Sequence, residues 1–431
     1  MPAHTPELLA PAGSLAMLHT AFAFGADAVY AGHPRYSLRV RNNEFGKLAI
    51  LAQGIQAAHE QGKPFYLASN LFAHNAKLAT YLQDMNEVVA LKPDALIMAD
   101  PGLIDLAREK WPEMPIHLSV QANTVNWAAA RFWRKLGIKR VILSRELSLE
   151  DIDEIRQRCP DIELEVFVHG ALCVAYSGRC LLSGYFNHRD ANQGACTNAC
   201  RWAYRLSAAG FDAEGAAQKV GLLEETRRPG ERMLIEEDEH GTYLFNSRDL
   251  RAIEHVARLA EIGVDALKIE GRTKSAYYVA RACQNYRAAI DDARAGRPFN
   301  PALLTNLERL AHRGYTDGFY RRHAPAEHQH YLAGHSASEQ AQYVGDAIAF
   351  DAARGLAEVR VRNRFQCGDR LETLHPAGNN IVTLRRMENA NGQEISVAPG
   401  NGHHVWIPLP ENSVGAFLAV IRHAGEKSGA P

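Results

Sequence analysis

The sequence predicts an α/β fold, a (β/α)8 TIM-like barrel with a C-terminal small antiparallel β-barrel domain. Three observations support it. Short apolar runs alternate with helix-like stretches over the first 275 residues, these units number about eight, and from about residue 340 short strand-like runs separated by turns replace them. Alternating strands and helices of this length form a parallel sheet. About eight such units favour a closed barrel over an open sheet.

The expected barrel strands are apolar runs that end in polar residues or glycine, and several begin just after a glycine that closes a helix, as at Gly25, Gly137 and Gly263. These runs are 8–11, 28–31, 65–70, 95–99, 116–120, 141–144, 164–168, 243–246 and 266–269. Helices are expected between them, most clearly at 82–89, 128–136, 149–158 and 249–262.

The chain is expected to divide into three parts. Residues 1–275 form the barrel, with a cysteine cluster and a surface insertion at 207–240 that is rich in Gly, Glu and Arg. Residues 276–335 form a helical connector, and residues 340–425 form the β domain. Its expected strands are 344–350, 356–361, 369–374, 380–385 and 404–407.

Composition narrows the class of protein. A chain of 431 residues suggests two or three domains, and its net charge of -1 gives no global basic field that would announce a nucleic-acid partner. The start lacks the pattern of a secretory signal, and we find no apolar stretch long enough to span a membrane. We therefore expect a cytoplasmic protein. The sequence leaves its oligomeric state open.

Polar residues alternate along three of the expected strands, so one face of each points into the barrel. The inward sets are Lys268, Glu270 and Arg272; His117, Ser119, Gln121 and Asn123; and Glu163, Glu165, Phe167 and His169. Asn70 and Arg145 end two further strands. Barrel interiors are usually aliphatic, and buried charges need partners. We expect a pocket for a polar, anionic small molecule, with a structural network of salt bridges as the alternative.

Four cysteines lie close together in the sequence, at Cys173, Cys180, Cys196 and Cys200, with the spacing C-x6-C-x15-C-x3-C. Thiolates so placed select zinc or an iron–sulfur cluster. The paired C-x2-C knuckles typical of structural zinc are absent from the sequence. Both metals remain open from spacing alone, as does a nucleophilic Cys173 assisted by His169.

The stretch 165–183, EVFVHGALCVAYSGRCLLS, resembles the signature of the U-32 peptidase family, E-x-F-x2-G-[SA]-[LIVM]-C-x4-G-x-C-x-[LIVM]-S. Further stretches are similar to one branch of that family, which hydroxylates uridine in tRNA. They are ELLAPAG (7–13), PRYSLRVRNNEF (34–45), HLSVQAN (117–123) and LKIEGRTK (267–274).

The resemblance implies a [4Fe-4S] cluster on the four cysteines and formation of 5-hydroxyuridine at the wobble position, in the tRNA anticodon loop. It also implies a requirement for prephenate and none for molecular oxygen. Arginine and lysine bind carboxylates, so Arg39, Arg41, Arg145, Lys268 and Arg272 are our candidates for holding prephenate. Asn70, Ser119, Gln121 and Asn123 complete the expected substrate site, and Glu165, His169 and Glu270 are candidates for proton transfer.

Two other functions remain open at this point. One is a collagenase-type peptidase, as the name of the family suggests, although the sequence shows neither a nucleophile-elbow serine nor an H-E-x-x-H zinc motif. The other is a non-catalytic partner that binds tRNA for another enzyme.

Overall fold

The computed structural model describes residues 4–33, 35–38, 43–172, 202–208, 220–226, 232–238, 241–242, 248–312, 314–321 and 340–422. Its centre is a closed barrel of parallel strands, in which the last strand pairs with both the first and the seventh. The strands are β1 (Glu7–Pro11), β2 (Ala28–Gly32), β3 (Phe65–Ser69), β4 (Ala95–Met98), β5 (Ile116–Leu118), β6 (Arg140–Ile142), β7 (Glu163–Ala171) and β13 (Ala266–Ile269). The predicted barrel is confirmed, and only the expected strand at 243–246 lies outside the described residues.

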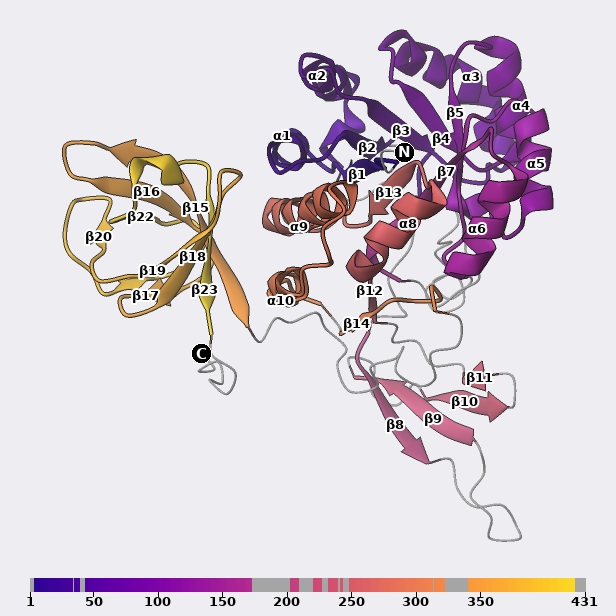
Figure 1. The fold of residues 1–431 in the computed structure, drawn as a ribbon. Helices are drawn as coiled ribbons and strands as arrows, with labels where there is room; N and C mark the ends of the chain where they lie inside the picture. Colours follow the sequence, from indigo (N-terminus) through magenta and orange to yellow (C-terminus); the bar gives the residue numbers. More distant parts are fainter. Residues whose placement is uncertain are drawn as a thin grey trace, which may run out of the picture.

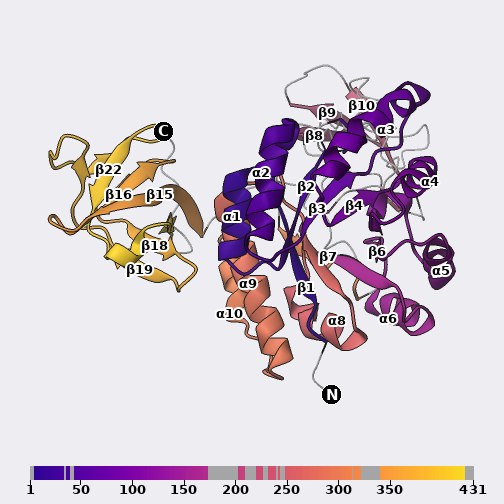
Figure 2. The same ribbon diagram turned by 90° about the horizontal axis from the view of Figure 1, so that it is seen from above.

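Helices cover the outside of the barrel, as Figures 1 and 2 show. They are α1 (Leu15–Ala23), α2 (Leu48–His59), α3 (Asn75–Ala90), α4 (Pro101–Lys110), α5 (Trp127–Lys135), α6 (Leu149–Arg158), α8 (Val256–Ile262) and α9 (Ala276–Arg294). Hydroxyl and amide side chains cap several N-termini, including Ser14 at α1, Asn126 at α5 and Ser148 at α6. Among the described residues, no helix is both long and apolar enough to cross a membrane.

The expected helix at 249–262 was too long. Its first residues form β12 (Asp249–Arg251), which pairs antiparallel with the end of β7, and a 3-10 turn (Ile253–His255) follows before α8 begins. β7 is longer than its apolar run, so its free edge continues beyond β6 and accepts this extra strand. β14 (Tyr315–Thr316) pairs with β12 in turn.

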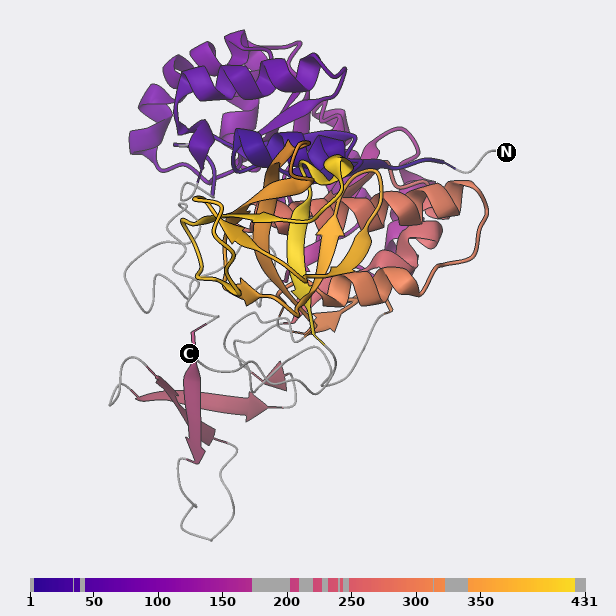
Figure 3. The same cartoon turned by 90° about the vertical axis from the view of Figure 1, so that its left-hand side faces the viewer.

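The described part of the region around the expected insertion contains a small antiparallel sheet. Its strands are β8 (Tyr204–Ala208), β9 (Val220–Glu225), β10 (Arg232–Asp238) and β11 (Gly241–Thr242). This sheet projects away from the barrel in Figures 1 and 3.

The C-terminal domain is a curled antiparallel sheet with its own apolar core, formed by residues such as Val344, Val359 and Leu418. Its strands are β15 (Ala341–Asp351), β16 (Leu356–Val361), β18 (Arg370–Leu374), β19 (Asn380–Thr383), β20 (Glu388–Asn389), β22 (His404–Ile407) and β23 (Phe417–Ile421), with β17 (Phe365–Gln366) and β21 (Val397–Ala398) paired beside them. All five expected strands are present. The sequence prediction missed β23, which pairs with both β15 and β18.

The two domains meet at α9, the long helix that packs on α1, α8 and β1. Arg281 of α9 is fully buried and forms an ion pair with Glu372 of β18. Arg309, which follows α10 (Ala302–Glu308), binds the other oxygen of Glu372 at 2.6 Å. Beside this ion pair the rings of Tyr277 and Tyr343 stack with centroids 4.9 Å apart. Polar and aromatic contacts therefore join the domains.

Candidate active site at the barrel mouth

The carboxyl ends of the eight barrel strands meet at one mouth, where enzymes of this fold carry their active sites. Polar residues follow four strand ends at this mouth: Asn70 after β3, Ser119 after β5, Arg145 after β6, and Glu270 after β13. The structure thus brings together predicted residues that lie up to 200 positions apart in the sequence.

One wall of the mouth is a set of cross-linked amides and hydroxyls. The Asn70 amide donates to Ser119 Oγ at 3.1 Å, and Asn70 Oδ1 accepts from the backbone N–H of Leu38 at 3.3 Å. Ser144 Oγ donates to Asn123 Oδ1 at 2.9 Å, while Asn123 adopts a left-handed backbone with φ 56. Gln121 is half-buried in the 3-10 turn between Ser119 and Asn123. These bonds fix the loops after β3, β5 and β6.

The floor of the mouth is a buried cation among aromatic rings. Lys268 is 3% exposed, and its Nζ forms an ion pair with Glu165 Oε1 at 2.7 Å. The same Nζ lies 4.3 Å from the centre of the Tyr30 ring and 5.6 Å from that of Phe167. The Arg145 guanidinium lies 3.8 Å from the Phe167 ring centre. The expectation that buried charges have partners is confirmed for Lys268 and Glu165, and two cations adjoin one aromatic ring.

Glu270 and Arg272 add one carboxylate and one further guanidinium to the mouth. The Tyr30 hydroxyl donates to the Ile269 carbonyl oxygen at 3.0 Å and lies 3.2 Å from Glu270 Oε2. Arg272 is buried, and a Cβ at Gly32 would lie only 2.3 Å from its Nη1. Glycine at position 32 therefore leaves the space that the guanidinium fills.

Beneath the mouth, charged side chains continue to the other end of the barrel. Arg140 Nη1 binds Glu7 Oε1 at 2.7 Å and Glu165 Oε2 at 3.3 Å, and Arg140 Nε binds Glu163 Oε2 at 2.8 Å. Burial acts to lower the pKa of Arg140, but Glu7 and Glu165 raise it overall, so the guanidinium stays charged. Burial raises the pKa of Glu7, and Arg140 opposes that rise.

Sequence reasoning missed Glu7 and Arg140. The alternation that revealed Lys268 also applies to the strands that begin at these residues, where Leu8 and Val141 occupy the helix side. The inward orientation expected for His117 is confirmed, because its ring meets Tyr66, another inward residue, at 4.7 Å. Burial, and then the positive charges of Arg140 and Lys268, lower the pKa of His117 well below its usual value, so its imidazole is neutral.

The inward orientation expected for His169 is wrong. The register between β7 and β13 shifts so that Lys268 faces Phe167 while Ile269 faces His169, which leaves Val168 as an extra residue. This bulge reverses the alternation, and His169 packs against Tyr278 and Tyr286 of the covering helix α9. Burial lowers the pKa of His169 to about 3. The proton-transfer role expected for it stays a prediction, as it does for Glu165 and Glu270.

Two groups of predicted site residues lie outside the described residues. Arg39 and Arg41 are one group, and Cys173, Cys180, Cys196 and Cys200 are the other. The chain reaches the first cysteine from the carboxyl end of β7, since Leu172 is the last residue described there. Within the described ranges, no cluster of His, Cys, Asp or Glu is arranged to hold a metal ion.

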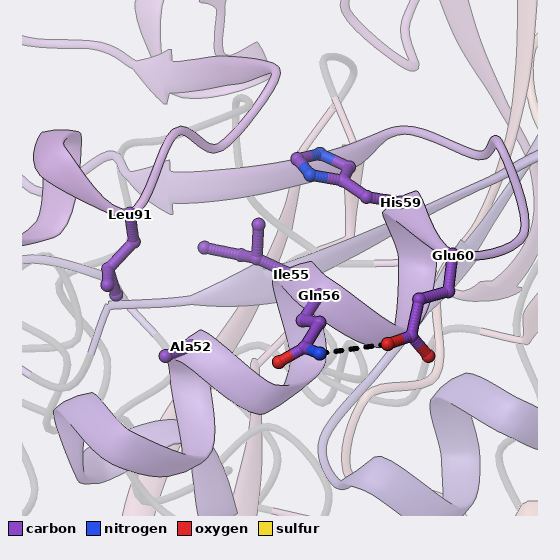
Figure 4. A pocket seen from close by; sticks show the side chains of 6 residues that line it. All are labelled: Ala52, Ile55, Gln56, His59, Glu60 and Leu91. Atoms are coloured by element: carbon purple, nitrogen blue, oxygen red, sulfur yellow. Dashed lines mark hydrogen bonds between the residues drawn. The ribbon is translucent and has the colours of Figure 1, made fainter.

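A shallow hollow on the outer surface lies apart from this site. It is lined by residues of α2 and by Leu91, just after α3, and Figure 4 shows its hydrogen bond between Gln56 and Glu60. Because α2 ends here and leads into the start of β3, the hollow is near the amino ends of the strands, opposite the mouth.

The mouth thus offers buried cations, an amide-lined wall and flat aromatic surfaces, which suit an anionic substrate and a planar one.

Two models of one protein family match most of this chain. The model of peptidase family U32 matches residues 13–330, and that of the peptidase family U32 C-terminal domain matches residues 339–419.

Relatives with curated names are similar in sequence. The tRNA hydroxylation protein P of Escherichia coli K12 is 55% identical over an alignment of 449 positions, gaps included, which covers 99% of each chain. The protein of the same name from Haemophilus influenzae is 54% identical over 94% of each chain. The 23S rRNA 5-hydroxycytidine C2501 synthase of Escherichia coli is 31% identical over 73% of this chain and 45% of its own length. The chain therefore belongs to peptidase family U32.

Proposed function

We propose that this chain is a tRNA-modifying enzyme that converts uridine to 5-hydroxyuridine at the wobble position. The observation that carries this proposal is its 55% identity, over 99% of both chains, to a protein named for tRNA hydroxylation. A more distant relative is named for hydroxylating carbon 5 of a cytidine in ribosomal RNA. We therefore propose position 5 of a pyrimidine as the target in this chain's tRNA substrate, and a tRNA substrate would place the enzyme in the cytoplasm.

The reaction replaces a C5–H bond by a C5–OH bond, which removes two electrons from the base. If molecular oxygen is not used, the oxygen atom must come from a second substrate or from water, and a second substrate, or an intermediate derived from it, must accept the two electrons. Prephenate is our candidate for this role. Its two carboxylates suit the Arg145 guanidinium, the Lys268 ammonium and Arg272, because fixed cations in a buried site bind anions strongly. Arg39 and Arg41 would add to this set.

The uracil base must leave its neighbours to reach the floor of the mouth. An anticodon loop already exposes its bases, so only a few kcal/mol of unstacking would be needed. The flat rings of Phe167 and Tyr30 lie beside Lys268 at the floor and provide surfaces for the base. Asn70, Ser119 and Asn123 offer amide and hydroxyl groups to its polar edge. Glu270, whose carboxylate lies 3.2 Å from the Tyr30 hydroxyl, is the proposed proton acceptor.

Four thiolates are a suitable donor set for a [4Fe-4S] cluster. The described end of β7 supports this assignment, because Ala171 and Leu172 lie at the carboxyl end of the strand, as the mouth does, and Cys173 is the next residue in the sequence. Cys159 and Cys283, by contrast, are buried in the core of the barrel domain. A bound cluster would supply one-electron chemistry or a Lewis-acidic iron. The described side chains would bind, orient and shield the substrates.

The decisive experiment is nucleoside mass spectrometry of tRNA from a strain that lacks the gene. The proposal predicts loss of 5-hydroxyuridine and of nucleosides derived from it, and their return when the intact gene is supplied. A gene carrying Cys173→Ser should fail to restore them, while one carrying Cys283→Ser should succeed. Unchanged levels of these nucleosides in the deletion strain would refute the proposed function.

A further inference from the structure

The charged side chains beneath the mouth form one connected series, which we call the charge column: Glu7, Arg140, Glu165 and Lys268. Consecutive members contact each other at 2.7, 3.3 and 2.7 Å. Arg140, Glu165 and Lys268 are at most 6% exposed. Its signs alternate from the amino end of the barrel to the mouth, so the formal charge of these four residues is zero. Glu163 also binds Arg140, at 2.8 Å, and is itself paired with Lys139 at 3.6 Å.

Stability alone is a weak explanation for the charge column. Burying an ion is costly, and apolar side chains of similar volume often stabilise a core equally well or better. Most barrels of this fold fill the same layers with Val, Ile and Leu. A row of fixed charges does achieve something that aliphatic packing cannot, because it determines the position and the effective charge of the group at its end. That group is Lys268, which borders the mouth.

We propose that Glu7 and Arg140 are positioning residues that set how strongly Lys268 attracts the carboxylate substrate, acting through Glu165 from the far end of the barrel. This inference rests on the proposed function. Glu165 shares its negative charge between Arg140 and Lys268. As long as Arg140 neutralises part of that charge, Lys268 keeps positive potential for a second anion above it.

Changes at Arg140 and Glu7, which lie toward the amino end of the barrel, should shift the dissociation constant for prephenate in opposite directions. Arg140→Met leaves the column with one excess negative charge, so the dissociation constant for prephenate should rise. Glu7→Gln leaves one excess positive charge, so the same constant should fall. A unit charge at Arg140 acts on Lys268 across two ion pairs and should change an anion's affinity by about tenfold, whereas one at Glu7 acts across three and should change it by less. Arg140→Lys keeps the charge but loses part of the contacts that the guanidinium makes, so the dissociation constant should rise less than in Arg140→Met.

Isothermal titration calorimetry of the intact protein with prephenate measures these constants without turnover. The steady-state KM for prephenate should follow them, while kcat changes much less, because neither residue touches the substrate. Arg134→Met is the matched control, since it removes an arginine whose side chain is 45% exposed and pairs with Asp161 on the surface. It should leave the affinity unchanged.

Two results would overturn the proposal. One is a loss of affinity for prephenate in both Arg140→Met and Glu7→Gln, because disrupted packing would weaken binding whatever the sign of the charge removed. The other is unchanged affinity in both. If Arg140→Met does not fold, the nearly isosteric Glu7→Gln is the deciding variant. Tighter binding of prephenate by Glu7→Gln would support the positioning role, and unchanged or weaker binding would refute it. A wild-type protein that binds prephenate but makes no 5-hydroxyuridine would refute the proposed function and leave this test intact. A wild-type protein that does not bind prephenate would refute both.

Discussion

Replacing Lys268 by Met removes the ammonium group at the floor of the mouth while keeping a chain of similar length. Glu165 is fully buried and would lose its 2.7 Å partner, keeping only Arg140 at 3.3 Å. Removing one partner of a buried ion pair costs about 3–5 kcal/mol. Because Arg140 still compensates Glu165 in part, we expect the free energy of unfolding to fall by about 3 kcal/mol, the lower end of that range.

The same change should abolish detectable binding of prephenate, since the mouth loses its central cation. Guanidinium unfolding gives the stability and calorimetry gives the affinity. Lys110→Met is the matched control, because Lys110 is an exposed residue at the end of α4, and we expect a change within about 0.5 kcal/mol and normal affinity. The double variant Lys268→Met with Glu165→Met should be less destabilised than the sum of its single changes. Wild-type stability and affinity in Lys268→Met would refute the assigned site.

Three further predictions concern other parts of the chain. Arg281→Met should lower the free energy of unfolding by about 3 kcal/mol, the lower end of the cost of breaking a buried ion pair, because Glu372 at the domain interface keeps Arg309 as its second partner. An undiminished value would show that the pair of Arg281 with Glu372 contributes little. Burial lowers the pKa of His33 to about 4 and that of His169 to about 3. As the pH falls below about 6.5, these histidines therefore take up protons in the unfolded chain before they do so in the folded one. The free energy of unfolding should then decrease by up to ~1.4 kcal/mol per pH unit for each histidine. A flat profile of unfolding free energy between pH 6.5 and 4.5 would contradict this. Cys173→Ser should remove the visible absorbance of anaerobically purified protein, and retained colour would exclude Cys173 as a cluster ligand.

Much of the barrel could be predicted because its strands are buried on both faces and read as apolar runs separated by helix-length segments. The polar interior could also be predicted, because Lys268 and Glu165 are charged residues that alternate with apolar residues along their strands. Their direct ion pair bears this out. Alternation also contained the signal for Glu7 and Arg140, but each stands at the very start of a strand, where the strand boundary is hard to place from sequence alone.

The rest depended on tertiary structure. The bulge in β7 that turns His169 toward α9 leaves no mark in the sequence, because it arises from the register with β13. β12 interrupts a helical pattern because the free edge of β7 offers hydrogen bonds that a local pattern does not reveal. β23 lies near the C-terminus as a short apolar run, and only its two neighbours, β15 and β18, establish it as a central strand.

The proposed function can be tested in one anaerobic reaction of the purified, cluster-loaded protein with unmodified tRNA and prephenate. We expect 5-hydroxyuridine at the wobble position, detected by mass spectrometry of nuclease fragments, and no product when prephenate is omitted or when Lys268→Met replaces the wild-type protein. Binding of tRNA without product under these conditions would contradict the proposed function and would favour a non-catalytic tRNA-binding role.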